Sequence, residues 1–194
     1  KLVAFPTETV YGLGANATNE QALLSIYATK RRPLSDPIIV HVLNQQQALN
    51  LAVTTVDERK VFLALTDKFW PGPLTVILKA NLEKLPLVVT AGTGFVGLRS
   101  PKQPTARKLI ELSGLPIGAP SANLFGHVSP TEPIHVFNDF YDQDVAIIDG
   151  ERCEYGLEST VVKLTEQKLS VLRQGSFTTE KLKEGLKGTD LENI

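Results

Sequence analysis

Residues 5–15 of the chain read Phe-Pro-Thr-Glu-Thr-Val-Tyr-Gly-Leu-Gly-Ala. The stretch begins at the end of an apolar run, Leu2 to Phe5, that is typical of a short buried strand, and Pro6 then removes a donor from the strand's hydrogen-bond ladder. Polar side chains and two glycines follow, where a continuing strand would need apolar residues, and glycine allows close approach of a ligand or another backbone. An ordinary strand exit can have the same composition. Two further unusual clusters favour a loop that contacts a ligand.

The first of these clusters is the basic run Lys30-Arg31-Arg32, which Pro33 follows. Cations favour the C-terminal end of a helix, and that explains one of the three charges. We expect an extended, proline-stiffened backbone that holds Lys30 and Arg32 on one side and Arg31 on the other. Two cations that face the same way are suited to binding phosphate, and arginine adds bidentate geometry.

The second cluster is Ala119-Pro120-Ser121-Ala122-Asn123. A Ser-x-Asn turn often does no more than satisfy its own backbone. Here small residues precede it and permit close approach of a ligand, so Ser121 and Asn123 are candidates for phosphate and ribose contacts.

Composition limits the class of protein. The 194 residues are 42% hydrophobic and 21% charged, which is typical of one globular domain, and we expect a single domain over residues 1–194. No apolar run is long enough to span a bilayer, nothing resembles a signal peptide, and the single cysteine, Cys153, suggests a reducing compartment, so we expect a cytoplasmic protein. The net charge of −1 suits a small anionic ligand better than a long polyanion. The chain lacks methionine and its first strand starts at once, so we expect native residues to precede Lys1.

Strands and helices are predicted to alternate, which favours an α/β or α+β fold. Besides the first strand, the pattern predicts strands over residues 38–43, 74–78, 94–98, 117–119, 146–149, 159–164 and 169–172. It predicts helices from Asn19 to Lys30, from Thr55 to Phe69 behind a capping box, from Pro104 to Leu112, and over residues 179–186.

Six motifs together resemble the YrdC-type threonylcarbamoyl-AMP synthases. They occur in the family's order and cover nearly the whole chain: residues 6–14, 30–41, 69–75, 96–99, 120–123 and 156–162. The resemblance implies a single YrdC-like domain in which a twisted, largely mixed sheet curves around a concave cavity, with helices packed outside.

The resemblance also assigns residues to the site. It implies an active-site tetrad of Lys30, Arg32, Ser121 and Asn123. For L-threonine it implies Thr9, His41, Arg99 and Ser159. For ATP it implies Arg32, Asp36, Phe95, Ala119, Ser121, Ser129 and Arg173. Gln174 stands where the family commonly has proline, and Arg31 and residues 34–36 also depart from the commoner form of the family motif.

The implied reaction joins L-threonine, bicarbonate or carbon dioxide, and ATP into L-threonylcarbamoyladenylate, with release of pyrophosphate. Mg²⁺ is expected with the nucleotide, held mainly by phosphates and water, and no metal site is predicted in the protein. The product would supply a separate transferase that forms N6-threonylcarbamoyladenosine in tRNA. With its net charge of −1, the chain is expected to bind tRNA weakly or not at all.

Two alternatives remain open. One is the carbamoyl-adenylate step of hydrogenase-maturation carbamoyltransferases, which would use carbamoyl phosphate. The other is a non-enzymatic module that binds double-stranded RNA or the ribosome through its concave face, which would favour a basic excess.

Overall fold

The computed structural model describes residues 1–165 and 168–187. Its strands form one ten-stranded mixed sheet in the order β10-β9-β5-β6-β3-β7-β2-β1-β8, with β4 paired to β5. The strands are β1 Leu2–Phe5, β2 Gly12–Asn16, β3 Val40–His41, β4 Ala52–Val53, β5 Leu74–Ala80, β6 Phe95–Arg99, β7 Ile117–Gly118, β8 Val145–Ile147, β9 Thr160–Thr165 and β10 Lys168–Arg173. The expected mixed α/β sheet is confirmed.

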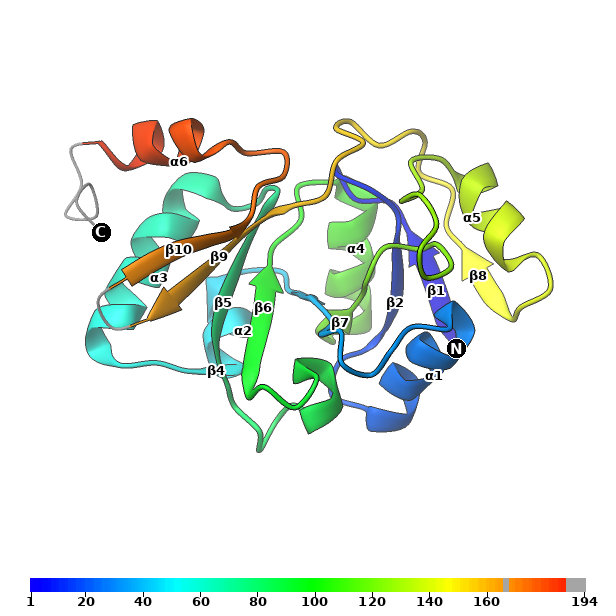
Figure 1. Cartoon of the computed structure of the whole chain (residues 1–194), viewed down its shortest axis with the longest axis horizontal. Coiled ribbons are helices and arrows are strands. Elements are labelled where there is room, and N and C mark those ends of the chain that lie inside the picture. The colour runs from blue at the N-terminus through cyan, green and yellow to red at the C-terminus, as the bar shows by residue number, and fades with distance from the viewer. Residues whose placement is uncertain (166–167, 188–194) are drawn as a thin grey trace.

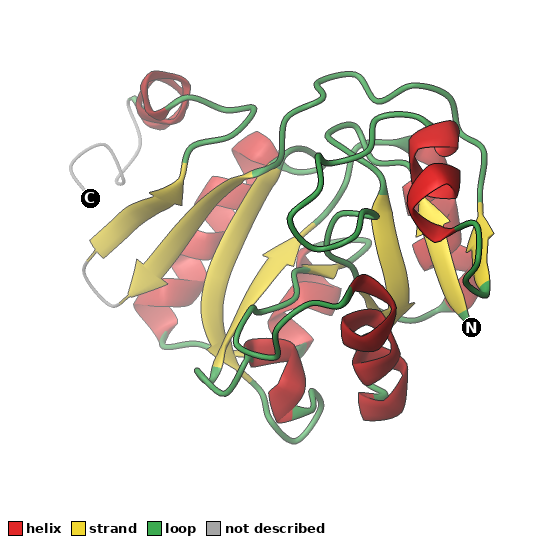
Figure 2. Cartoon of the chain, turned by 45° about the vertical axis from the view of Figure 1, so that its right-hand side comes forward, coloured by secondary structure: helices red, strands yellow, loops and turns green. Residues whose placement is uncertain are grey.

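Helices lie around this sheet. They are α1 Glu20–Lys30, α2 Gln45–Asn50, α3 Val56–Phe69, α4 Pro104–Ser113, α5 Pro133–Phe140 and α6 Thr179–Leu186, with a 3-10 turn, η1, at Leu87–Thr90. The long helix α3 lies behind β5, β9 and β10 in both views (Figures 1 and 2), while α5 lies beside β8 at the opposite end of the molecule.

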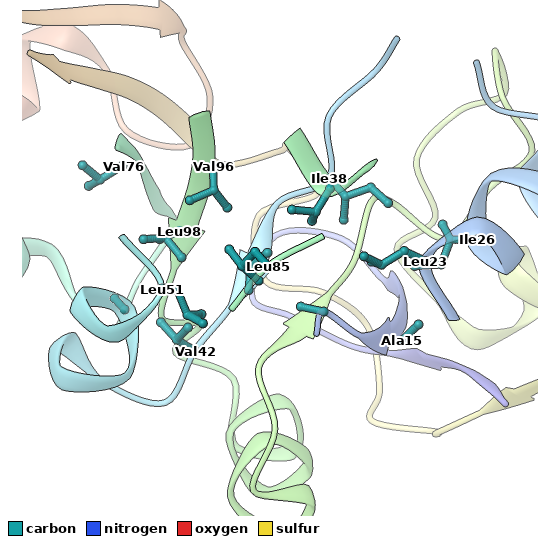
Figure 3. Packing of buried hydrophobic residues seen from close by; sticks show 14 of the residues in the cluster. Ala15, Leu23, Ile26, Ile38, Val42, Leu51, Val76, Leu85, Val96 and Leu98 are labelled. Carbon is teal, nitrogen blue, oxygen red and sulfur yellow. The ribbon is translucent and has the colours of Figure 1, made fainter. Parts of the chain in front are cut away.

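The core forms where the buried faces of the central strands meet the helices. Val76, Val96 and Leu98 come from β5 and β6, and Leu23 and Ile26 come from α1 (Figure 3). All five side chains are fully buried. This continuous apolar layer supports the strands from one side and leaves their other face to form the cavity described below.

Local signals in the sequence placed several elements correctly. The helix α3 begins with the predicted capping box, in which the Thr55 hydroxyl accepts from the Glu58 amide and the Glu58 carboxylate accepts from the Thr55 amide. Asn19 caps α1, and Gly114 ends α4 in the left-handed region with φ 65°. These features depend on backbone hydrogen bonds within a few residues, which a sequence pattern can reveal.

The expectation of a loop over residues 5–15 was wrong in its second half. Gly12–Asn16 is strand β2, which runs antiparallel to β1 and places Gly14 opposite Val3. A Cβ on Gly14 would lie 2.7 Å from Phe5 Cε1 and 2.8 Å from Ile117 Cγ2, so this glycine serves close packing of strands.

The extended backbone expected at the basic run was also wrong. Lys30 is the last residue of α1, and Arg31 ends the helix in the left-handed region with φ 53°. The side chains of Lys30 and Arg32 are therefore directed by a helix end and not by strand alternation. The predicted strand over residues 38–43 is reduced to Val40–His41, and α2, β4, η1 and α5 were not predicted.

Candidate functional site

A cavity of about 270 Å³ lies against the inner face of the sheet. Segments that are far apart in the sequence line it: the loop before β2, the segment after α1, the turn after β7, and strands β5, β6 and β9. Of the residues predicted for the site, eight line this cavity: Thr9, Arg32, His41, Arg99, Ala119, Ser121, Ser159 and Arg173.

Arg99 at the end of β6 is buried in an ion pair with Glu8. Its Nη2 donates to Glu8 Oε1 at 2.7 Å, and its Nη1 donates to Thr9 Oγ1 at 3.0 Å. The second carboxylate oxygen of Glu8 accepts from the backbone amides of Lys102 at 3.0 Å and Gln103 at 3.4 Å. Glu8, which does not line the cavity, therefore fixes the orientation of the Arg99 guanidinium. Two of the five guanidinium N–H groups bind these side chains and a third contacts a backbone carbonyl, which leaves donors for a ligand carboxylate.

His41 is fully neutral in this setting. Burial, followed by the positive charge of Arg99, lowers the pKa of its imidazole from 6.5 to about 3. Its ring packs edge-on against Phe5 at 5.8 Å between centroids, and its Nδ1 has no hydrogen-bond partner among the described residues. An uncharged imidazole at the cavity wall can form hydrogen bonds with polar ligand atoms. Unlike a charged imidazolium, it does not attract the anionic groups of a ligand.

Three neighbouring strands contribute polar groups along the same wall. Thr75 of β5 and Ser159, directly before β9, are both buried, and their hydroxyl oxygens lie 2.8 Å apart. The Arg173 guanidinium donates from Nη2 to Ser159 Oγ and from Nε to the Ser159 carbonyl, each at 3.1 Å. Hydroxyls and a cation therefore converge at this end of the cavity.

Arg173 also forms an ion pair with Glu158. The Glu158 carboxylate accepts a further bond of 3.1 Å from the Ser129 hydroxyl. Ser129 and Arg173, both predicted as ATP contacts, therefore meet at one carboxylate that the sequence reasoning did not select. Ser129 does not itself line this cavity, and contributes to a second, more open hollow beside α5.

Lys30 does not line the cavity. Its Nζ donates to the carbonyl oxygens of Ser121, at 2.5 Å, and Asn123, so that the ammonium group holds the Ser-x-Asn turn against the end of α1. Burial, followed by the positive charge of Arg32, lowers the pKa of Lys30 from 10.5 to about 7. The prediction that the Lys30 and Arg32 side chains face the same way was therefore wrong, because Arg32 lines the cavity and Lys30 does not.

The remaining predicted site residues, Asn123, Arg32, Asp36 and Phe95, have different surroundings. Asn123 is buried and donates from Nδ2 to the carbonyls of Leu124 and His127, while its Oδ1 has no partner among the described residues. Arg32 lines the cavity and lies 3.7 Å from Asp36, which does not. Phe95 also lies outside the lining, where the Lys163 ammonium lies 3.8 Å from its ring centroid.

Within the described part of the chain, no three His, Cys, Asp or Glu side chains cluster in a way that could hold a metal ion. The carboxylates beside the cavity face cations: Glu8 pairs with Arg99, Glu158 with Arg173, and Asp36 with Arg32. These residues do not fit a protein-held Mg²⁺ site. No helix in the described ranges is long and apolar enough to cross a membrane.

The chain matches the Sua5/YciO/YrdC family model, described as "Telomere recombination", over residues 1–175. The chain belongs to this family. Among curated members, it is 47% identical over 184 residues to a threonylcarbamoyl-AMP synthase of Pyrococcus abyssi, covering 95% of this chain and 53% of that protein. It is 44% identical over 182 residues to the threonylcarbamoyl-AMP synthase of Bacillus subtilis, covering 94% of this chain and 52% of the relative.

Solved structures of the Sua5/YciO/YrdC family agree with the fold. The crystal structure of P. abyssi Sua5 complexed with L-threonine superposes with a TM-score of 0.90 at 46% identity, over 96% of this chain and 54% of that one. Escherichia coli YciO superposes with a TM-score of 0.79 at 22% identity, over 93% of this chain and 86% of YciO, and shows the fold alone. The chain spans about half the length of the first curated relatives that it matches.

Sequence reasoning missed two acidic residues of this candidate site, Glu8 and Glu158. A signal was present for each, because Glu8 lies within the polar loop of residues 5–15 and Glu158 directly precedes the predicted Ser159. Glutamate is common on protein surfaces, and only the structure shows Glu8 buried at 2% side-chain exposure against Arg99.

Proposed function

We propose that this chain is an enzyme, the catalytic domain of an L-threonylcarbamoyladenylate synthase. The observation that carries the proposal is the convergence of Arg32, Arg99 and Arg173 on one small cavity whose histidine is neutral. Such a cavity suits ligands that bring several negative charges. Relatives at 47% and 44% identity are named threonylcarbamoyl-AMP synthase, and a Sua5 relative was crystallised with L-threonine.

In this proposal the amino acid occupies the end of the cavity near Arg99. Its carboxylate binds the remaining donors of the Arg99 guanidinium, and Thr9, His41 and Ser159 contact its other polar atoms. Glu8 contributes by keeping Arg99 oriented. Predicted nucleotide contacts lie toward Arg32, Ser121 and Arg173, which all line the same cavity.

The chemistry needs no covalent enzyme intermediate. The threonine amine adds to carbon dioxide to form a carbamate and releases a proton, and a carbamate oxygen then attacks the α-phosphorus of ATP with pyrophosphate as the leaving group. Catalysis consists of positioning and of stabilising the charge that develops on the phosphates. Arg32 and Arg173 supply that charge stabilisation, and Lys30 keeps the Ser121 turn in place.

A magnesium ion bound with ATP would supply further charge neutralisation. The described residues offer no set of free carboxylates for it, so nucleotide phosphates and water would be its main ligands. As part of the same proposal, the adenylate passes in the cytoplasm to a separate transferase that modifies tRNA, and this chain makes no extensive tRNA contact.

The test is pyrophosphate release from ATP and bicarbonate, with and without L-threonine, and with L-serine for comparison. Release that depends on L-threonine is expected. Absence of release from folded protein with every amino acid tried would overturn the proposal, and carbamoyl phosphate and RNA would then be the next ligands to test.

A further inference from the structure

The proposed function gives the α-ammonium group of the amino acid no partner of opposite charge. L-threonine is a zwitterion, and Arg99 suits its carboxylate but not its α-ammonium group. A charged group that leaves water for a cavity needs a partner of opposite charge or good hydrogen-bond acceptors. The following inference rests on the proposed function and concerns this ammonium group.

The charged side chains that line the cavity are unevenly divided. Arg32, Arg99 and Arg173 are cations, and His41 is neutral because burial lowers its pKa to about 3. Among the described residues that line the cavity, Glu158 is the sole carboxylate. Glu8 and Asp36 do not line it, and both oxygens of Glu8 are engaged by Arg99 and backbone amides.

Glu158 retains capacity for another donor. A carboxylate has about four lone-pair positions. The described contacts of Glu158 use one oxygen for Arg173 and the other for Ser129. Its side chain is 36% exposed, in contrast to the 2% of Glu8, so an ammonium group can reach it from the cavity.

The strand order brings Glu158 within reach of an amino acid bound at Arg99. Strands β6, β5 and β9 are neighbours, and Thr75 of β5 connects the two ends of this wall through its 2.8 Å contact with Ser159. Leu98 pairs with Val76 and Val76 with Val162, so Arg99 lies level with Val161, two inter-strand spacings or roughly 10 Å away, and Ser159 is two residues from Val161. That span accommodates an amino acid held by a salt bridge at each end.

We infer that Glu158 binds the α-ammonium group of the amino-acid substrate and, together with Arg99, selects for an α-amino acid. Arg99 takes the carboxylate and Glu158 takes the amine, so the two charged ends of the zwitterion determine its orientation. The amine is thereby held beside Ser159, at the wall of the cavity that Arg173 also reaches.

The experiment compares two ligands by calorimetry: L-threonine and 2,3-dihydroxybutanoate, in which a neutral hydroxyl replaces the ammonium group. Glu158→Gln is expected to weaken L-threonine binding roughly 10- to 100-fold, as for the loss of one hydrogen bond to a charged group. Binding of 2,3-dihydroxybutanoate should change far less, because that ligand carries no ammonium. Glu158→Asp, which keeps the carboxylate, should preserve more of the preference for L-threonine than Glu158→Gln.

The matched control is Glu154→Gln. Glu154 lies on the same loop, is 55% exposed and pairs at 4.0 Å with Lys102, so its replacement should leave both affinities unchanged. Equal weakening of both ligands by Glu158→Gln would assign Glu158 a purely structural role through Arg173 and would overturn the inference, as would unchanged L-threonine binding. If the wild-type protein binds no L-threonine, the proposed function itself fails.

Discussion

His41 is an imidazole that folding keeps neutral, and its titration should therefore appear in the stability of the protein. The pKa of its imidazole is about 3 in the folded protein, against an ordinary value of 6.5, so the unfolded chain binds more protons between these two pH values. The stabilisation is fully present above pH 6.5 and is lost as the pH falls toward about 3.

We expect the free energy of unfolding of the wild type to fall more steeply than that of His41→Gln as the pH is lowered from 6.5 to 4. Urea denaturation at several pH values measures this difference. His135→Gln is the control for the change of histidine to glutamine itself, because His135 is exposed. Parallel curves for wild type and His41→Gln would show that His41 protonates in the folded state without penalty.

Arg32 and Arg31 are adjacent arginines with different surroundings. Arg32 lines the cavity, whereas Arg31 is exposed at the end of α1. We expect Arg32→Ala to lower kcat/KM for pyrophosphate release. The substitution removes one anion-stabilising donor, which costs about 2–4 kcal/mol of transition-state stabilisation. Arg31→Ala should remain near the wild-type value. Near-normal turnover by Arg32→Ala would remove Arg32 from the mechanism.

At the scale of single elements, local signals succeed where an element is long and capped by its own side chains. The capping box of α3 and the Asn19 cap of α1 were both predicted. The six residues of α2 and the two of β4 are too short to show a period of apolar residues. For α5 a signal was present and overlooked, since Pro133 occupies its first turn and Val136 and Phe140 form its buried face.

The α3 cap provides a test at this scale. Thr55→Ala removes the hydroxyl that accepts from the Glu58 amide, and we expect it to lower the free energy of unfolding by about 1 kcal/mol. Urea denaturation of Thr55→Ala and of its neighbour Thr54→Ala gives the comparison, because Thr54 makes no cap contact in the helix. An equal effect of both substitutions would mean that the hydroxyl of Thr55 contributes nothing specific.

At the scale of the whole molecule, the cavity joins segments from residue 7 to residue 173. A ligand that binds there bridges both halves of the sheet and favours the folded state by mass action. L-threonine at 100 times its Kd should raise the free energy of unfolding by about 2.7 kcal/mol.

The corresponding increase in melting temperature is roughly 5–11 °C for a chain of this size. Thermal melts with increasing L-threonine measure it, and L-serine at the same concentrations should produce a smaller shift if the threonine methyl group is recognised. No shift at any L-threonine concentration would show that the free amino acid does not bind the folded chain.

The sequence by itself determined the features that arise within a few residues of each other. Helix caps, β-branched strands and the glycine that ends α4 follow from backbone hydrogen bonds and steric limits, and six ordered motifs identified the family. Only the tertiary structure decided which charges meet. Glu8 and Arg99 are 91 residues apart in the chain, and Lys30 reaches the carbonyl of Asn123 across 93 residues. Strand order decides which groups become partners, and burial decides the protonation state of each group. Local spacing in the sequence encodes neither strand order nor burial.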